Sequence, residues 1–366
     1  MPKQIFALGK SIGVEVETTQ QLPSDAQRDL PNRLFQTTHD ASIESDVRIS
    51  PRDNSTIIRS SSLRSLQNGQ RVTMGTEIVS TPIDLETDSP DDMVKILCKW
   101  LSESGEPCMS ERAGIHIHVG LGAFNMDMLH SSIYWGRHLE ALFFHLAGNG
   151  YEFRGVKNNA AYCRPITKNG PPYLPSGNRG VYQKTFDIDD MLEAKSTKHF
   201  WYLYGATNSG NVGRYVPQRY IWLNWYSLLA HGTLEFRPWN VTQNAAYILA
   251  EIELCQLFTR AVIKSIPAPS EEHSAFDMRR LGYEELQHDL DHIAHLWGMT
   301  DRSYKILSMI VRRTPLMDLP NEATLSHLSY NMPWDGSFGY SPRTTNSVVT
   351  PQIVTIHTLR GEPERN

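Results

Sequence analysis

Cysteines are few in this sequence, neither sign of charge dominates, and no stretch is apolar enough to cross a membrane. The four cysteines (Cys98, Cys108, Cys163 and Cys255) lie far apart without a CxxC pair, so neither a zinc knuckle nor a disulfide framework is indicated. A net charge of −5 provides no general attraction to nucleic acids or anionic membranes. Without a run of ~18 apolar residues or a signal-like N-terminus, we expect a soluble cytoplasmic protein.

Several common catalytic motifs are also missing. The sequence has no GxxxxGK[ST] motif and no GxGxxG motif between a strand and a helix, which argues against a P-loop and a Rossmann-type dinucleotide site. It also lacks the GxSxG motif that carries the nucleophile of α/β-hydrolases. Any chemistry must therefore be inferred from other arrangements of polar residues.

One such arrangement lies in residues 114–120, GIHIHVG, which alternate as a β-strand does. Because successive side chains of a strand point to opposite faces, His116 and His118 share one face and three apolar side chains share the other. A His-x-His pair alone is weak evidence for a site. Its weight comes from three other runs of the same design.

Those runs carry carboxylates and one guanidinium. Glu15 and Glu17 alternate with valines, Glu77 lies between Thr and Ile, and Glu235 and Arg237 alternate with apolar residues. Placed side by side, the four runs predict a sheet with an apolar face packed on helices and a second face rich in carboxylates and imidazoles. Since clustered carboxylates repel one another, we expect divalent cations on that face.

Carboxylate oxygens favour hard cations, so Mg²⁺ or Mn²⁺ is expected in preference to Zn²⁺. Mg²⁺ held by carboxylates usually also holds phosphate oxygens, which suggests a nucleotide. Arg237 would then stabilise the charge that develops during phosphoryl transfer. The alternative for Arg237 is a structural ion pair with Glu235 that braces the sheet.

Two irregular segments are rich in cations. Residues 48–71 contain five arginines and one acid, and we expect a mobile loop or hairpin whose charge suits a lid over phosphates. Residues 153–184 contain six cations and no acid in a proline-rich stretch. This basic loop is a functional candidate, and anchoring to an acidic surface is the competing explanation.

Helical periodicity marks five segments: 90–104, 124–146, 244–266, 283–299 and 302–312. Ser89 and Pro90 form a strong start for the first of them. The histidines of the second helix, His130, His138 and His145, are not at chelating spacing with the His-x-His pair. We therefore expect each of these three to be structural.

In chain order the motifs are GVEVE at 13–17, HDASI at 39–43, TEIVSTP at 76–82, GIHIHV at 114–119, the segment from Arg219 to Asn224, and GTLEFR at 232–237. This ordered set resembles the putative amidoligase family, which is related to glutamine synthetase and glutamate–cysteine ligase. The matches cover roughly the first two-thirds of the chain. The arginine- and serine-rich insertion between Ser42 and Gly75 departs from the family pattern.

The resemblance implies an α+β fold of the glutamine synthetase catalytic-domain type, with a curved, mainly antiparallel sheet and helices on its convex face. It implies one catalytic domain over residues 1–328, with an insertion at 44–74 and the basic loop at 153–184. Residues 329–366 would form a C-terminal extension or tail. The concave face would bind ATP and two or three Mg²⁺ or Mn²⁺ ions.

The resemblance also implies roles for individual residues. The implied metal ligands are Glu15, Glu17, Glu77, His116 and Glu235. The implied nucleotide or substrate contacts are His116, His118, Arg219 and Asn224, and Arg179 of the basic loop is a further candidate for nucleotide binding. The implied catalytic residues are Arg237, Glu235 and Asp40.

Together these features predict an ATP-dependent carbon–nitrogen ligase, an amidoligase. A carboxylate would attack the γ-phosphorus of ATP, an amine would capture the acyl phosphate, and the basic segments would exclude water. The alternatives are a metal-dependent hydrolase that needs no ATP and a non-catalytic protein that binds a polyanion. The expected partners are small-molecule, peptide or protein carboxylates and amines. A modified base also fits, membranes are not expected partners, and the oligomeric state is open.

Overall fold

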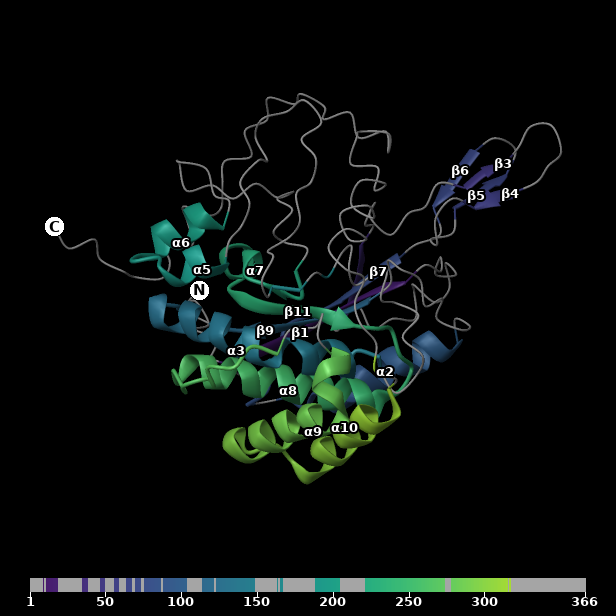
Figure 1. Cartoon of the computed structure of the whole chain (residues 1–366). Coiled ribbons are helices and arrows are strands. Elements are labelled where there is room, and N and C mark those ends of the chain that lie inside the picture. Colours follow the sequence, from purple (N-terminus) through teal and green to yellow (C-terminus); the bar gives the residue numbers. More distant parts are fainter. Residues whose placement is uncertain are drawn as a thin grey trace.

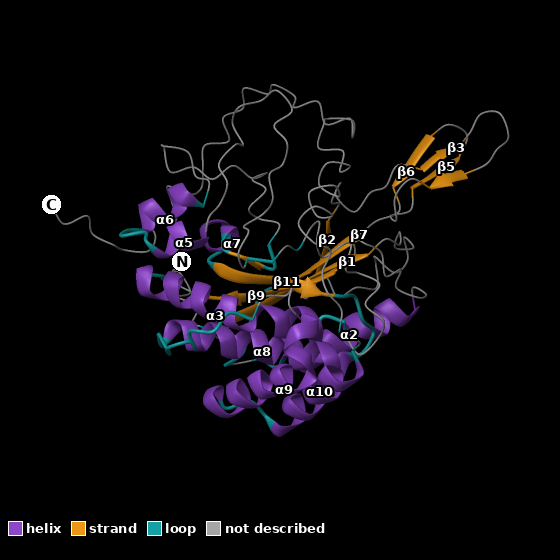
Figure 2. Ribbon diagram, in the orientation of Figure 1, coloured by secondary structure: helices purple, strands orange, loops and turns teal. Residues whose placement is uncertain are grey.

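The computed structural model of the chain shows a β-sheet packed on a layer of helices (Figures 1 and 2). The structure describes residues 11–18, 35–38, 47–49, 56–58, 64–67, 70–73, 76–86, 88–103, 114–121, 123–148, 188–204, 221–273 and 278–314, with Gly9, Cys163, Pro165, Ile166 and Leu316. The sheet and its helices confirm the α+β class expected from the sequence.

Every described pairing in the main sheet is antiparallel, and the sheet is open. Its strands are β1 (Ser11–Thr18), β2 (Phe35–Thr38), β7 (Thr76–Ser80), β8 (Ile83–Asp84), β9 (Gly114–Gly120), β10 (Leu223–Asn224) and β11 (Thr233–Trp239). They lie in the order β10-β11-β9-β1-β7-β2, and β8 pairs with β1. The histidine strand β9 is therefore flanked by the two strands that carry Glu15, Glu17, Glu235 and Arg237.

Two small hairpins lie in the predicted insertion. Strand β3 (Val47–Ile49) pairs with β4 (Thr56–Ile58), and β5 (Arg64–Gln67) pairs with β6 (Gln70–Thr73), both antiparallel. The hairpin alternative for residues 48–71 is thereby confirmed. A lid function for this segment stays a prediction.

Helices cover one face of the sheet and extend past one of its ends. The helices behind the sheet are α2 (Pro90–Glu103), α3 (Met126–Leu146) and α8 (Ala245–Ile263), and α9 (Met278–Trp297) and α10 (Asp301–Arg313) pack on α3 and α8 farther from the strands (Figure 2). Helices α5 (Ile188–Leu192), α6 (Thr197–Leu203) and α7 (Tyr226–Ala230) lie at the β10 end (Figure 2). All five predicted helices are present. Asn125 and Asn244 cap α3 and α8 by accepting hydrogen bonds from backbone N–H groups two or three residues on.

Two boundaries differ from the sequence expectations. Helix α9 begins at Met278, but Gly282 interrupts it with a φ of 74°, so the predicted start at 283 matches the part beyond this break. Residues 219–225, which contain the motif segment from Arg219 to Asn224, read as a strand in the sequence, but within the described part the strand β10 is limited to two of them. Helix α7 follows at once, because the Asn224 side chain accepts from the Tyr226 N–H (2.9 Å) and turns the chain.

The apolar face of the sheet packs on α3 and α8, as the alternating pattern predicts. Phe236 of β11 stacks on Phe143 of α3 at 5.8 Å and meets Phe258 of α8 edge-on at 5.3 Å. Ile117 and Val119 of β9 are fully buried in the same core. This packing fixes the strands from behind and leaves their opposite face for polar side chains.

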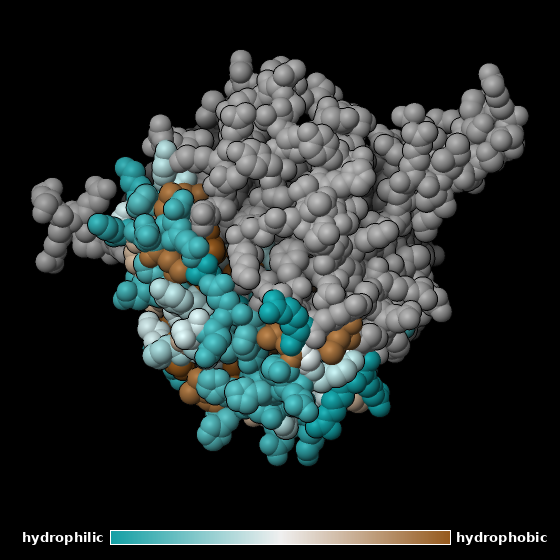
Figure 3. Space-filling view, viewed as in Figure 1, coloured by the Kyte–Doolittle hydropathy of each residue, from teal (hydrophilic) through white to brown (hydrophobic). Residues whose placement is uncertain are grey.

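The outer surface of the helical layer is largely hydrophilic in the view of Figure 3. Among the described residues, no helix combines the length and the hydrophobicity needed to cross a membrane.

Candidate active site on the polar face of the sheet

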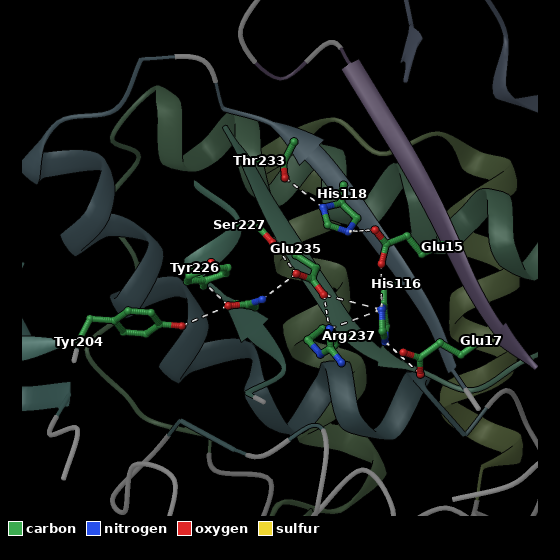
Figure 4. Close-up of polar contacts among 11 residues, drawn as sticks. Glu15, Glu17, His116, His118, Tyr204, Tyr226, Ser227, Thr233, Glu235 and Arg237 are labelled. Carbon is green, nitrogen blue, oxygen red and sulfur yellow. Dashed lines mark hydrogen bonds and ion pairs between the residues drawn. The ribbon is translucent and has the colours of Figure 1, made fainter. Parts of the chain in front are cut away.

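The register of three strands brings the predicted polar side chains together. In the β1–β9 pair Glu15 lies opposite His116, and in the β9–β11 pair Glu235 lies opposite His118. Directly opposed residues of antiparallel strands share a face, so these side chains converge (Figure 4). We call the group formed by Glu15, Glu17, His116, His118, Glu235 and Arg237 the polar cluster.

Glu15 links the two histidines. Its Oε1 lies 3.2 Å from His118 Nε2, and its Oε2 lies 3.4 Å from His116 Nδ1. Glu17 approaches the other side of the same imidazole, with 3.8 Å between its Oε2 and His116 Nε2. Each ring nitrogen of His116 therefore faces a carboxylate of β1.

Glu235 is held by the protein at both carboxylate oxygens. Oε1 pairs with Arg237 and lies 3.7 Å from His116 Nδ1. Oε2 accepts hydrogen bonds from Asn224 Nδ2 (2.6 Å) and Ser227 Oγ (2.5 Å). The buried carboxylate is thus fixed in orientation, as a preorganised site requires.

Opposite charges within the cluster lower the pKa values of two of its carboxyl groups. Burial alone would raise the pKa of the Glu235 carboxyl, but the charge of Arg237 and the two imidazoles lower it to about 2. Burial opposes ionisation of Glu15 as well, yet His118 and His116 hold its pKa well below the ordinary value. Both carboxylates are consequently anionic at neutral pH.

The two histidines differ in protonation. Burial and the nearby Arg237 charge lower the pKa of His116, which favours the neutral imidazole. Burial acts in the same direction on His118, but Glu15 and Glu235 raise its pKa to about 8. His118 Nδ1 also lies 3.0 Å from Thr233 Oγ1, so the two nitrogens of a protonated His118 face a hydroxyl and a carboxylate.

The donor set of the cluster suits a divalent cation. Glu15, His116 and Glu235 each offer one ligand atom, and these atoms lie within 4.8 Å of one another. Two anionic carboxylates beside a neutral imidazole are donors that Mg²⁺, Mn²⁺ and related ions accept.

The structure brings most of the predicted site residues together. Within the described residues, the polar cluster and Asn224 meet as expected. Glu77 is placed by its backbone alone, opposite Glu17 in the β1–β7 pair. Asp40, Arg179 and Arg219 lie outside the described residues, as does the side chain of Glu77.

Sequence reasoning missed the residues that hold the cluster from outside. Thr233 could have been found, because it precedes Glu235 and Arg237 at the two-residue period of one strand face. Ser227 and Tyr204 carry no such signal: Ser227 reaches Glu235 from α7, and the Tyr204 hydroxyl donates to Asn224 Oδ1 (3.2 Å). Only the folded chain places them beside the site.

The fold is an open antiparallel sheet with helices packed on one face. The other face carries buried acids, imidazoles and a guanidinium. The chain belongs to the family described as "putative amidoligase enzyme", whose model matches residues 9–259. The match includes every strand of the polar cluster and ends inside α8. No curated protein matches the chain. Membership of this family indicates a ligase-type enzyme.

Proposed function

We propose that this protein is an ATP-dependent carboxylate–amine ligase that works through an acyl phosphate, on a fold of the glutamine synthetase catalytic-domain type. The observation that carries the proposal is the convergence of Glu15, His116 and Glu235 within 4.8 Å, beside the guanidinium of Arg237. Family membership supports the ligase class.

The cluster would hold two or three Mg²⁺ or Mn²⁺ ions. The proposed ligands are Glu15, Glu17, His116 and Glu235, with Glu77 as a further candidate from the neighbouring strand. A neutral His116 has a lone pair to offer a cation, whereas a protonated His118 is suited to phosphate oxygens. We therefore assign His116 to the metal and His118 to the phosphates of the nucleotide.

When bound, the metal–ATP complex supplies an electrophilic γ-phosphorus. A substrate carboxylate oxygen forms a bond to that phosphorus and ADP leaves. An amine then attacks the acyl carbon, phosphate leaves, and the nitrogen loses a proton to give the amide. The polar cluster contributes by orienting charges, since this route needs no covalent nucleophile from the protein.

Arg237 is placed to stabilise charge on the transferring group. It is 7% exposed, pairs with Glu235, and has its Nη1 3.5 Å from His116 Nδ1. The pair with Glu235 keeps the guanidinium fixed before any substrate arrives, which limits reorganisation during the reaction. The proposed role of Glu235 is thus both to bind metal and to orient Arg237.

Asn224 fits a positioning role beside the cluster. It is 2% exposed, its Nδ2 donates to Glu235, and its Oδ1 accepts from Tyr204 and Tyr226. These bonds orient the Glu235 carboxylate.

Other proposed contributions rest on sequence resemblance. Asp40 is proposed as a catalytic residue, and Arg179 and Arg219 as nucleotide or substrate contacts. The single catalytic domain over 1–328, with residues 329–366 as an extension, belongs to the same proposal. The cation-rich segments would close over the phosphates and exclude water.

The test is a screen of carboxylates and amines for ADP release with Mg²⁺ or Mn²⁺, with the product identified by mass. We expect ADP release that depends on both substrates and a product heavier than the carboxylate by the amine minus water. The variant Glu15→Gln/Glu17→Gln should lose at least about 100-fold in turnover, because two proposed metal ligands lose their charge. Glu284→Gln, an exposed residue of α9, is the matched control and should keep the parent rate.

The same screen separates the alternatives. A metal-dependent hydrolase would release product without ATP and without an amine. A non-catalytic binding protein would release no ADP with any pair of substrates. If the doubly substituted variant consumed ATP at the parent rate, the proposed site would be wrong.

A further inference from the structure

A second group of metal-binding side chains lies in the helical layer, away from the polar cluster. His138 of α3, His273 of the α8–α9 connection and Asp289 of α9 each offer one ligand atom, all within 4.8 Å of one another. His138 and Asp289 are 3% and 1% exposed. We call this group the α3–α9 cluster.

The hydrogen bonds of His138 leave one ring nitrogen without a partner. Its Nδ1 lies 3.1 Å from the carbonyl oxygen of Glu271, which can only accept, so Nδ1 carries the proton. Nε2 has no hydrogen-bond partner among the described residues and faces Asp289 Oδ1 at 3.7 Å. A lone pair and a carboxylate oxygen of two buried side chains thus face each other, an arrangement that a cation between them would stabilise.

The backbone around the cluster is held in place. His273 donates its N–H to the Arg137 carbonyl (3.1 Å), and its own carbonyl accepts from the Ala141 N–H (2.8 Å), so it is docked on the turn of α3 that carries His138. Trp135 Nε1 donates to the Ile266 carbonyl (2.9 Å) and ties the connection to the same helix. These contacts fix two of the three potential ligands before any ion binds.

Asp289 faces both imidazoles at once. Its Oδ2 lies 2.6 Å from His273 Nδ1, while its Oδ1 faces His138. In a tetrahedral zinc site, ligand atoms at roughly 2.0–2.2 Å from the ion lie roughly 3.3 Å apart. The two separations from Asp289, 2.6 and 3.7 Å, lie on either side of that distance.

We propose that His138, His273 and Asp289 bind one borderline transition-metal ion of the Zn²⁺ class, and that this ion clamps α9 to α3. Two imidazoles and one carboxylate favour such an ion over Mg²⁺ or Ca²⁺. Three protein ligands leave a fourth position for water. The hydrogen bond from His138 Nδ1 to the Glu271 carbonyl already orients the ring, as is usual for metal-ligating histidines.

The position of the cluster gives the ion a structural role. His138 lies in the part of the chain that the family model matches, whereas His273 and Asp289 follow its end at residue 259. One ion would therefore join the C-terminal helices to the family-type core. It would stabilise the folded chain by binding it in preference to the unfolded chain.

The experiment compares melting temperatures of chelator-treated protein with and without Zn²⁺. Because Zn²⁺ can also bind the polar cluster, the comparison is made in the Glu15→Gln/Glu17→Gln background, where that site is weakened. We expect Zn²⁺ to raise the melting temperature of this background by several degrees, and expect the shift to be lost when His138→Gln or Asp289→Asn is added. Adding His295→Gln, at an exposed histidine of α9, should leave the shift in place. A full shift with His138→Gln and with Asp289→Asn would overturn the proposal and leave a metal-free His273–Asp289 hydrogen bond.

A second measurement uses the unaltered chain, so it does not depend on whether the variants fold. Hydrogen exchange with and without Zn²⁺ should show slower exchange in residues 264–273 and in α9. Protection limited to β1, β9 and β11 would place the ion on the polar cluster instead and would refute the proposed clamp. Exchange unchanged throughout would refute it as well.

Discussion

The polar face of the sheet and the helical layer behind it treat a buried glutamate in opposite ways. Glu235 receives two hydrogen bonds and the charge of Arg237, and its pKa falls to about 2. Neither carboxylate oxygen of Glu251 on α8 has a hydrogen-bond partner among the described residues, and burial raises its pKa to about 8. Both side chains are buried. Hydrogen-bond and charge partners, rather than the degree of burial, therefore decide which of the two carboxyl groups is ionised.

The same contrast separates the histidines. His118 lies between two carboxylates, and these raise its pKa. His138, in the helical layer, has one carbonyl and one carboxylate at the edge of reach, and burial lowers its pKa. The sheet face thus gathers charges of opposite sign, whereas burial keeps Glu251 and His138 of the helical layer neutral. The following changes test this difference.

Removing the guanidinium from the polar cluster should have the largest effect. Arg237→Met leaves the Glu235 carboxylate buried without its counter-charge, which should cost about 3–5 kcal/mol of unfolding free energy and abolish turnover. Urea denaturation at neutral pH measures the loss. Arg237→Met/Glu235→Gln should recover part of that stability because the charges of both members of the pair are removed together. A double variant no more stable than Arg237→Met would contradict the importance of the ion pair.

Glu251→Gln should change how stability depends on pH. The folded-state pKa of Glu251 is raised, so the parent chain loses stability as pH rises from the unfolded pKa, about 4.5, through about 8. The neighbouring Cys98 and Cys255 have pKa values raised by burial and stay neutral in this range. Relative to Glu251→Gln, the parent should lose about 3 kcal/mol between about pH 5 and about pH 8. If the unfolding free energies of the two proteins changed with pH in the same way, the pKa of Glu251 would not be raised and the carboxyl would have partners in the folded chain.

Ser227→Ala is the mildest of these changes. It removes one of the two hydrogen bonds to Glu235 Oε2, which should cost about 1–2 kcal/mol and lower turnover. Ser308→Ala is a control in the helical layer, where the hydroxyl meets the neutral Gln287 amide at 3.1 Å. The control should cost about 0.5–1 kcal/mol and leave turnover unchanged. Equal turnover in both variants would argue against a positioning role for Ser227.

Periodicity predicted the polar face because each strand carries its own pattern. Glu15 and Glu17, His116 and His118, and Glu235 and Arg237 are each two residues apart, so their shared face follows from strand geometry. The register, which sets Glu15 opposite His116, is determined by contacts between strands and is not written in any one segment. The motif order supplied what periodicity could not, namely that these strands are neighbours.

The α3–α9 cluster could not be found in this way. The sequence predicts a structural His138, because this residue is not at chelating spacing with the His-x-His pair, and that prediction is not contradicted. The partners of His138 come from a connection without periodicity and from another helix, and the docking of His273 on α3 depends on backbone hydrogen bonds. Helix α7 was missed for a similar reason, since a side-chain bond of Asn224 starts its turn.

The most direct test of the polar cluster is a calorimetric titration of Mn²⁺, with a non-hydrolysable ATP analogue, into the parent chain and Glu15→Gln/Glu17→Gln. We predict binding of both ligands to the parent, at least about 10-fold weaker metal binding in the variant, and unchanged binding in Glu284→Gln. Equal Mn²⁺ and nucleotide binding by parent and variant, or no binding by either, would contradict a metal–nucleotide site on this face of the sheet.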